Sequence, residues 1–310
     1  MSKDIRASID IGSNSVLLLI ADLSSGKLVE ISKRSEITSL GKELDKNQSF
    51  HEESMEATFE AIKSYAEDCD KIGIPRESII ATATEASRVA QNAASFFAEI
   101  ESKLKVKINI ISPGAEAYFS TKGILFNSNF SSEIITIMDI GGASTELIKV
   151  NTKNFQILDT ISMPIGSVRC SQWLIDDLFV QNLQKVFLDF RNEIDRFQTK
   201  ELYCVAGTVT SLGNMHLQRK EFIEDDVHGM LLKAEDMDAL FKRYSEFTPE
   251  QFLELFPFLQ KRSKSIRGGL HLVYHLISRL FVKQLTISTY GLRFGTLLEG
   301  NINKEHLYGK

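Results

Sequence analysis

Short apolar runs separated by turn residues predict three antiparallel strands at the start of the chain. The runs are Arg6–Ile11, Val16–Asp22 and Leu28–Lys33, and glycine-containing turns separate them. Beyond them, Glu52–Ile72 has apolar residues at the spacing of one helix face. The next predicted elements are a strand at Ser78–Ala83, a helix at Glu85–Ile100 that breaks near Gln91–Asn92, a strand at Val106–Ile111 and a helix that opens at Ser112–Gly114.

The second half of the chain repeats this order. Its predicted strands are Ile134–Asp139, Thr145–Val150, Phe155–Ser162, Glu201–Val205 and Gln284–Ser288, and its clearest helices are Phe179–Phe197 and Gly291–Glu299. The repetition predicts a duplicated α/β protein with mixed sheets, divided into residues 1–128 and 129–310 at a Ser/Asn-rich stretch. The final helix, 291–300, could pack back on the first domain. Because ligands of such sheets bind beyond strand ends, we expect a cleft between the two domains.

Composition is that of an ordinary globular protein. The 310 residues are 43% hydrophobic and 25% charged, with a formal net charge of −5. No run is long enough to cross a bilayer, and the three cysteines are widely spaced, so we expect a cytoplasmic protein without a membrane or nucleic-acid partner. One local exception is the basic cluster Lys261–Arg267, where Lys264 and Arg267 are candidate contacts for a polyanion. The alternative is a solvated helix start.

Two phrases nearly repeat each other: Asp10–Ser15 and Asp139–Thr145. Each follows an apolar run and precedes another, so each predicts strand, acidic residue, glycine turn and strand. Small residues in such turns let backbone N–H groups approach an anion. The candidate phosphate-binding residues are Ser13, Asn14 and Ser15 in the first turn and Gly141, Gly142, Ala143 and Ser144 in the second. The alternative is two tight hairpin turns without a ligand.

Carboxylates beside these turns are candidates for a divalent cation. Asp10 and Asp139 occupy matching positions, and strand alternation places Glu146 on the same face as Ser144. Hard oxygen ligands of this kind favour Mg²⁺. The alternatives are an aspartate that caps its own turn and an exposed strand glutamate.

Three further positions follow predicted strands at helix starts. Gly207 and Thr208 offer N–H groups at a helix N-terminus, where anions are favoured, although Thr208 could simply cap the helix. Arg88 could hold a phosphate, or it could form a surface ion pair. Glu116 lies in a first helical turn, a position that favours the ionised carboxylate of a general base. Serine-hydrolase, Walker A and GxGxxG motifs are missing from the sequence, and His271 and His275 have no third metal ligand beside them.

The ordered phrases resemble the exopolyphosphatase and guanosine pentaphosphate phosphohydrolase family, in its short two-domain form. The phrases are Asp10–Ser15, Ala81–Arg88, Ile111–Ala117, Asp139–Glu146, Ala206–Thr208 and Gly291–Gly295. The resemblance implies a duplicated actin-like fold (ribonuclease H-like, shared with acetate kinase, sugar kinases and Hsp70). It also implies Glu116 as the base that activates water, Asp139 at the divalent cation, and phosphate contacts by the glycine turns and Arg88.

This chain departs from the family pattern at several positions. Ala115 and Tyr118 flank Glu116 where the family often has glutamate and arginine, and Ala143 replaces a glycine. Lys264 replaces an aspartate, Arg267 is an additional basic residue, and Phe294 replaces a glutamate. These changes make the local charge more basic.

We therefore expect a Mg²⁺-dependent hydrolase that releases terminal orthophosphate from polyphosphate or from guanosine pentaphosphate, a nucleotide of the stringent response. Two alternatives stay open. One is a kinase or ATPase of the same fold, and the other is a non-catalytic sensor that binds polyphosphate or guanosine penta- or tetraphosphate. The last third of the chain is largely helical and could form the interface of a homodimer.

Overall fold

The computed structural model describes residues 4–126, 130 and 132–309, and the chain divides into two compact units. Unit 1 combines Met1–Gly123 with Leu292–Lys310, and unit 2 is Ile124–Gly291. The boundary predicted between residues 128 and 129 lies outside the described residues. The structure divides the chain at Gly123 and again at Gly291, so the last helix belongs to unit 1.

Unit 1 is built on a five-stranded mixed sheet with the order β3-β2-β1-β4-β5. The strands are β1 (Ile5–Ile11), β2 (Ser15–Asp22), β3 (Val29–Ile37), β4 (Ile80–Ala83) and β5 (Ile108–Ile110). The first three pair antiparallel, as their short turns require, while β4 and β5 are parallel to β1 and arrive through helical crossovers.

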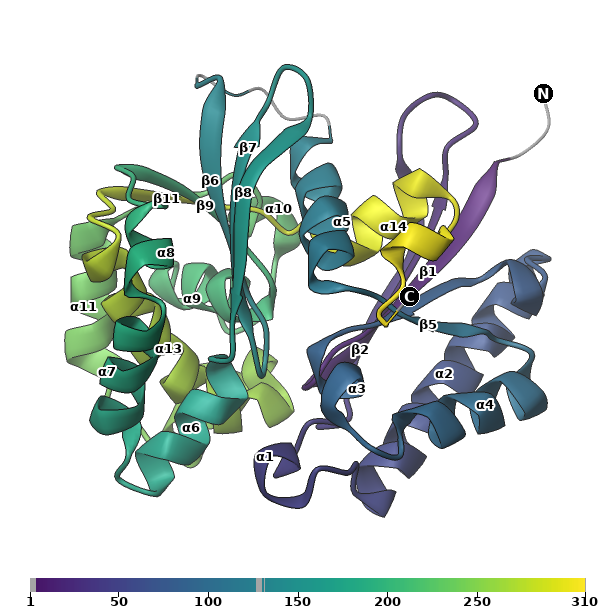
Figure 1. Cartoon of the computed structure of the whole chain (residues 1–310), viewed down its shortest axis with the longest axis horizontal. Helices are drawn as coiled ribbons and strands as arrows, with labels where there is room; N and C mark the ends of the chain where they lie inside the picture. Colours follow the sequence, from purple (N-terminus) through teal and green to yellow (C-terminus); the bar gives the residue numbers. More distant parts are fainter. Residues whose placement is uncertain (1–3, 127–129, 131, 310) are drawn as a thin grey trace. The chain divides into compact units, whose positions relative to one another are not determined.

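Helices cover both faces of this sheet (Figure 1). They are α1 (Leu44–Asn47), α2 (Glu52–Ile72), α3 (Glu85–Val89), α4 (Ala93–Leu104), α5 (Pro113–Leu125) and α14 (Leu292–Glu299), with 3₁₀ turns at Arg76–Ser78 and Lys304–His306. Ala7, Ile9 and Ile11 of β1 join the buried cluster that contains α2 and α4. Ser8 points to the other face, where its hydroxyl donates to the Arg293 carbonyl of α14 at 2.7 Å.

Unit 2 repeats this topology with one added strand. Its sheet has the order β10-β11-β9-β6-β7-β8. The strands are β6 (Ile134–Ile140), β7 (Thr145–Asn151), β8 (Gln156–Met163), β9 (Glu201–Val205), β10 (Leu231–Lys233) and β11 (Gln284–Ile287). Strands β8-β7-β6-β9-β11 match β3-β2-β1-β4-β5 in order and direction. The predicted duplication is therefore confirmed; the short strand β10 was not expected from the sequence.

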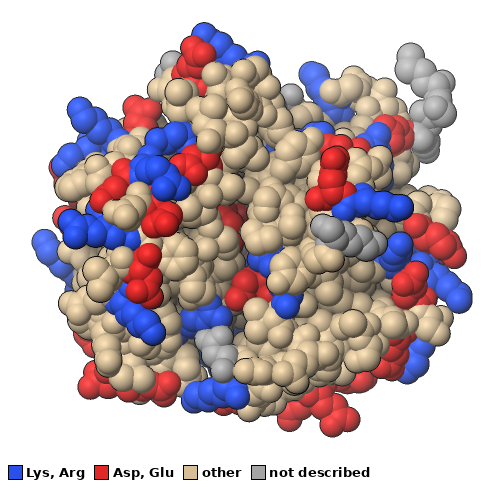
Figure 2. Space-filling view, viewed as in Figure 1, with Lys and Arg blue, Asp and Glu red and all other residues tan. Residues whose placement is uncertain are grey.

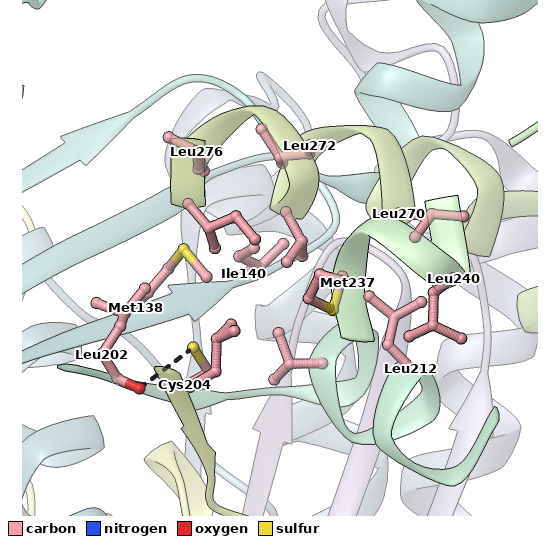
Figure 3. Packing of buried hydrophobic residues seen from close by; sticks show 14 of the residues in the cluster. Met138, Ile140, Leu202, Cys204, Leu212, Met237, Leu240, Leu270, Leu272 and Leu276 are labelled. Carbon is pink, nitrogen blue, oxygen red and sulfur yellow. Dashed lines mark hydrogen bonds between the residues drawn. The ribbon is translucent and has the colours of Figure 1, made fainter. Parts of the chain in front are cut away.

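The core of unit 2 lies between its sheet and a helical layer. The helices are α6 (Ser167–Ile175), α7 (Phe179–Asp189), α8 (Arg191–Asp195), α9 (Gly207–His216), α10 (Glu224–Val227), α11 (Ala234–Tyr244), α12 (Pro249–Leu255) and α13 (Ser263–Arg279), with a 3₁₀ turn at Pro257–Arg262. Figure 3 shows Met138, Ile140 and Cys204 packed beneath leucines of α13. Burial raises the pKa of the Cys170 and Cys204 thiols, which keeps them protonated and unreactive.

Candidate functional site

The first glycine turn joins β1 to β2 and is held rigidly by the segment after β3. The N–H of Gly12 donates to the Ser15 carbonyl at 2.9 Å, which closes the turn. The N–H groups of residues 38 and 39 donate to the Asn14 carbonyl, and that of Gly41 donates to the Ser13 carbonyl at 2.7 Å. A side chain on Gly41 would come within 2.9 Å of the Ser13 Cβ, so the close approach requires glycine. Backbone hydrogen bonds thus hold the turn in its conformation.

Two residues of unit 1, Asn14 in the first glycine turn and Ser87 on α3, have buried polar side-chain atoms. The Nδ2 of Asn14 and the Oγ of Ser87, a side chain on α3, have no hydrogen-bond partner among the described residues. A buried polar group without a partner is destabilising, and in native proteins it commonly marks a place where a ligand or water binds. Sequence reasoning named Asn14 but missed Ser87, which is part of the Ala81–Arg88 phrase.

Glu116 and Arg88 form a buried ion pair in unit 1. The Glu116 Oε2 accepts from the Arg88 Nη1 at 2.9 Å, and the two side chains are 10% and 6% exposed. The same Nη1 donates to the Ile111 carbonyl at 2.9 Å. Two charges withdrawn from water must pair closely, so each side chain fixes the position of the other. Arg88 does form an ion pair, as the alternative interpretation expected, but the pair is buried and not at the surface. Phosphate binding by Arg88 stays a prediction.

The start of α5 fixes the backbone of Glu116. Pro113 suits a first helical position because it has no N–H to satisfy. Ser112 acts as the cap: its Oγ accepts from the Ala115 N–H at 3.2 Å, and its carbonyl accepts from the Glu116 N–H at 2.9 Å. The carboxylate therefore extends from a rigid first turn.

The second glycine turn, in unit 2, closes in the same way as the first. The N–H of Gly141 donates to the Ser144 carbonyl at 3.0 Å. The start of α6 packs directly on this turn, with the Val168 N–H donating to the Gly142 carbonyl at 2.9 Å. A Cβ on Gly166 would lie 2.5 Å from the Gly142 carbonyl and the Ala143 nitrogen. The alanine that replaces a family glycine at 143 is accommodated in this tightly packed turn.

Asp139 and Glu146 are directly opposite each other on β6 and β7. Opposed residues of antiparallel strands point to the same face with Cβ atoms about 5 Å apart. Glu146 is only 2% exposed, and its Oε1 accepts from the Ser162 hydroxyl at 2.7 Å. Opposed carboxylates of this kind can bind one cation together. This donor set of carboxylates and a buried position fit a hard divalent cation.

Asp10 is at the matching end of β1 in unit 1. It lies two residues after Ser8, so its side chain is on the face of the sheet that α14 covers. Within the described ranges, no three His, Cys, Asp or Glu side chains form a cluster able to hold a metal ion. Asp139 and Glu146 are thus a pair within unit 2, and Asp10 belongs to the other unit.

The strand-to-helix turn between β9 and α9 contains a strained residue. Ala206 has φ 80° and ψ 167°, a region almost restricted to glycine, and such strain persists where the surroundings impose it. Gly207 and Thr208 follow at the helix N-terminus, where N–H groups favour an anion. The Arg262 guanidinium lies against Gly207, because a Cβ there would meet its Nη1 at 2.3 Å.

Arg262 has no carboxylate partner among the described residues. Burial lowers the pKa of its guanidinium, and no acid opposes that effect. A desolvated, unpaired positive charge beside a helix N-terminus is arranged to receive an anion. Sequence analysis included Arg262 in the basic cluster Lys261–Arg267 but did not select it, because only the tertiary fold brings it to Gly207.

The two basic residues that were selected, Lys264 and Arg267, lie on α13, after the 3₁₀ turn that ends at Arg262. Lys264 is exposed. The Arg267 Nε donates to the Ser245 carbonyl at 2.6 Å, and its Nη2 pairs with Glu246 at 2.9 Å. On the face shown in Figure 2, Lys and Arg side chains are interspersed with Asp and Glu and do not form one broad basic surface. Contacts of Lys264 and Arg267 with polyphosphate stay predictions.

The residues that depart from the family pattern contact other parts of unit 1. Ala115 and Tyr118 line a surface hollow of about 390 Å³ together with residues of the C-terminal segment. The Tyr118 hydroxyl donates to Glu299 at 3.0 Å. Phe294 is fully buried in unit 1, with the Lys33 ammonium 5.3 Å from its ring centroid. The Glu116–Arg88 pair is present in this chain together with these departures.

Two similar halves, each with an acid and a glycine turn after its first strand, define an actin-like α/β protein. A family model described as the Ppx/GppA phosphatase family matches residues 19–303. The chain belongs to the Ppx/GppA phosphatase family, and the resemblance drawn from its motifs is confirmed. A solved Ppx/GppA family member from Aquifex aeolicus has a TM-score of 0.77 at 26% identity, covering 97% of this chain and 100% of that one.

Relatives carry names of several phosphatases. A bifunctional 3-dehydroquinate synthase/phosphatase of Fusobacterium nucleatum is 31% identical over 97% of this chain and 47% of its own length. A guanosine-5'-triphosphate,3'-diphosphate pyrophosphatase of Pseudoalteromonas translucida is 29% identical, covering 95% and 59%. Exopolyphosphatase 2 of Mycobacterium tuberculosis is 26% identical, covering 94% and 97%. The chain thus spans about half the length of the first two.

No helix within the described part of the chain has the length and apolarity to cross a membrane.

Proposed function

We propose that this protein releases the terminal orthophosphate of inorganic polyphosphate or of guanosine pentaphosphate, with Glu116 as the general base. The observation that carries the proposal is the buried pair of Glu116 and Arg88, 2.9 Å apart, at the start of α5. A carboxylate held by a buried guanidinium is fixed in one orientation, and a general base must be positioned to accept a proton from water. Relatives named for both substrates support the substrate class.

In the proposed reaction, Glu116 takes a proton from a water molecule while the water oxygen bonds to the terminal phosphorus. The bridging P–O bond breaks, and its electron pair stays on the shortened phosphate chain. Among the described residues, the Arg88 guanidinium donates only through Nη1, so Nε and Nη2 can bind the transferred phosphoryl group. The buried Asn14 amide and Ser87 hydroxyl supply further donors within the same unit.

Unit 2 has its own set of candidate phosphate contacts. The N–H groups of Gly207 and Thr208 and the Arg262 guanidinium are arranged about one helix N-terminus. The turn Gly141–Ser144 supplies backbone donors. Such fixed donors stabilise charge that develops in phosphoryl transfer, and positioning with charge neutralisation provides most of the rate.

Asp139 and Glu146 would hold Mg²⁺, because they are opposed on neighbouring strands and carboxylate oxygens are ligands that this ion prefers. When bound, the ion would supply positive charge to the phosphate oxygens. Glu146 is oriented for this role by the Ser162 hydroxyl at 2.7 Å. Asp10, at the matching strand end of unit 1, stays a candidate metal ligand.

The test compares phosphate release by wild type, Glu116→Gln and a control, Glu101→Gln, which is an exposed glutamate of α4. Polyphosphate, guanosine pentaphosphate and ATP are assayed side by side with and without Mg²⁺. We expect release by wild type and by the control, and none by Glu116→Gln, with unchanged circular dichroism. Full activity of Glu116→Gln would show that another group is the base.

The same assay separates the alternatives. Phosphoryl transfer from ATP to an acceptor, without release to water, would indicate a kinase of the same fold. Tight binding of polyphosphate or guanosine tetraphosphate by a wild-type protein that releases no phosphate would indicate a sensor.

A further inference from the structure

The C-terminal segment Asn303–Tyr308 pairs with the chain just before α5, and we call it the C-terminal clamp. Ile111 and Leu307 form an antiparallel bridge. The Ser112 N–H donates to the His306 carbonyl at 2.8 Å, and the Tyr308 N–H donates to the Ile110 carbonyl at 3.0 Å. Since β5 is the outer strand of the unit 1 sheet, the clamp satisfies backbone groups at an edge that the sheet leaves open.

The residues held by the clamp are the ones that support Glu116. The Ile111 carbonyl accepts from Arg88 Nη1, the nitrogen that also donates to Glu116. The Ser112 carbonyl accepts from the Glu116 N–H at 2.9 Å. On its other side, the Ile111 N–H donates to the Ala83 carbonyl of β4 at 3.0 Å. Ile111 and Ser112 are thus fixed between β4 and the clamp.

Side chains of α5 hold the clamp in place. The His306 ring stacks on Tyr118, with centroids 5.6 Å apart and planes at 21°. It also meets the buried Phe119 edge-on at 4.8 Å. The Tyr118 hydroxyl and the Lys122 ammonium both bind Glu299 at the end of α14. Tyr118, a departure from the family pattern, is therefore the residue on which the clamp rests.

We propose that the C-terminal clamp positions the general base, and that Tyr308, through its backbone N–H, is a positioning residue. The proposal rests on the proposed function of Glu116. Loss of the clamp would free Ile111 and Ser112 on one side, and with them the Arg88 contact and the first turn of α5. A displacement of about 1 Å in a catalytic group can lower a rate by about 10²-fold.

The test replaces Tyr308 by proline, which removes the N–H donated to Ile110. Leu307, the residue before it, has φ −80° and ψ 146°, a conformation that proline permits in its neighbour. The matched control is Tyr308→Ala, which keeps the N–H and removes a side chain that is 51% exposed. A second variant ends the chain after Ile302 and removes the whole clamp.

We expect Tyr308→Pro and the shortened chain to lose about tenfold or more in kcat with KM nearly unchanged. The acid limb of the pH profile should move to higher pH, because a loosened Arg88 favours the ionised Glu116 less. Tyr308→Ala should match wild type. Equal kcat and equal pH profiles for the proline and alanine variants would overturn the proposal.

Amide hydrogen exchange separates this result from a failure of the proposed function. In Tyr308→Pro, the amides of Ser112 and Glu116 should exchange faster than in Tyr308→Ala. Unchanged exchange would overturn the positioning role even if the wild type hydrolyses phosphate. If Glu116→Gln keeps full activity, the general-base assignment fails and the role of the clamp in catalysis fails with it, whatever the exchange shows.

Discussion

The guanidinium of Arg88 binds the carboxylate of Glu116 and the carbonyl of Ile111 through one nitrogen, at 2.9 Å to each. This arrangement links the end of β4, through α3, to the start of α5. It joins two motifs that are 28 residues apart in sequence. Both side chains are almost fully buried, so the contact is specified by packing as well as by charge.

Arg88→Gln should lower kcat/KM by about 10²-fold, because it removes a positioned charged donor. It should also move the acid limb of the profile to higher pH, since the positive charge that favours an ionised Glu116 is lost. Steady-state rates measured from about pH 5 to about pH 9 give both the fall in kcat/KM and the shift of the acid limb. Arg76→Gln is the control because it breaks the Arg76–Asp70 pair at the surface of the same unit. A profile for Arg88→Gln parallel to that of the control would contradict the positioning role.

Glu146→Gln should raise the Mg²⁺ concentration needed for half-maximal activity by about 10- to 100-fold. Mg²⁺ should raise the melting temperature of wild type more than that of this variant, because a carboxylate ligand has been replaced by a neutral amide. Thermal unfolding with and without Mg²⁺ checks the second point, since a bound ion stabilises only the protein that binds it. Glu201→Gln, at the exposed start of β9, is the control. Equal stabilisation of wild type and Glu146→Gln by Mg²⁺ would exclude Glu146 as a ligand.

Arg262→Met should weaken phosphate-chain binding and leave folding intact. We expect KM to rise about 10-fold or more, because a charge-assisted contact is lost, and Arg262→Lys to recover part of the loss. The melting temperature should stay the same or increase, because a desolvated charge without a carboxylate partner is removed. Arg279→Met is the contrast, since Arg279 pairs with Asp195 in the same unit. A large loss of stability in Arg262→Met would assign this arginine a structural role instead.

Stability should fall as the pH drops from about 7 to about 5. Burial lowers the pKa of His271 and His275 on α13, so both are neutral in the fold. Below the usual histidine pKa, the unfolded chain binds protons that the folded chain does not, and unfolding is favoured. Melting temperatures at several pH values measure this slope. The double variant His271→Gln/His275→Gln should flatten it, whereas His51→Gln in unit 1 should not. An unchanged slope in the double variant would assign the pH dependence to other groups.

Most of the helices and strands could be predicted from local patterns in the sequence. The helix predicted at Glu52–Ile72 is α2 with the same bounds, and the break predicted near Gln91–Asn92 separates α3 from α4. The two acid-and-glycine phrases form turns with the same closing hydrogen bond. These features depend on neighbouring residues, and side-chain periodicity and turn chemistry report them directly.

Contacts between distant segments could not be predicted in the same way. The sequence suggested a shared face for Ser144 and Glu146, but the pairing of Glu146 with Asp139 depends on strand register. The short strand β10 has no strong alternation over its three residues. The placement of Arg262 against Gly207 requires the packing of α13 on α9, which no local signal encodes.

The duplicated α/β fold, the family, the candidate base and the phosphate turns could all be predicted from the amino-acid sequence, because they follow from local patterns and ordered motifs. The pairing of Arg88 with Glu116, the position of Arg262 at α9 and the inclusion of residues 292–310 in unit 1 became known from the folded chain alone. Burial, strand register and helix packing arise when segments far apart in the chain exclude water from one another, and local sequence patterns do not report such contacts.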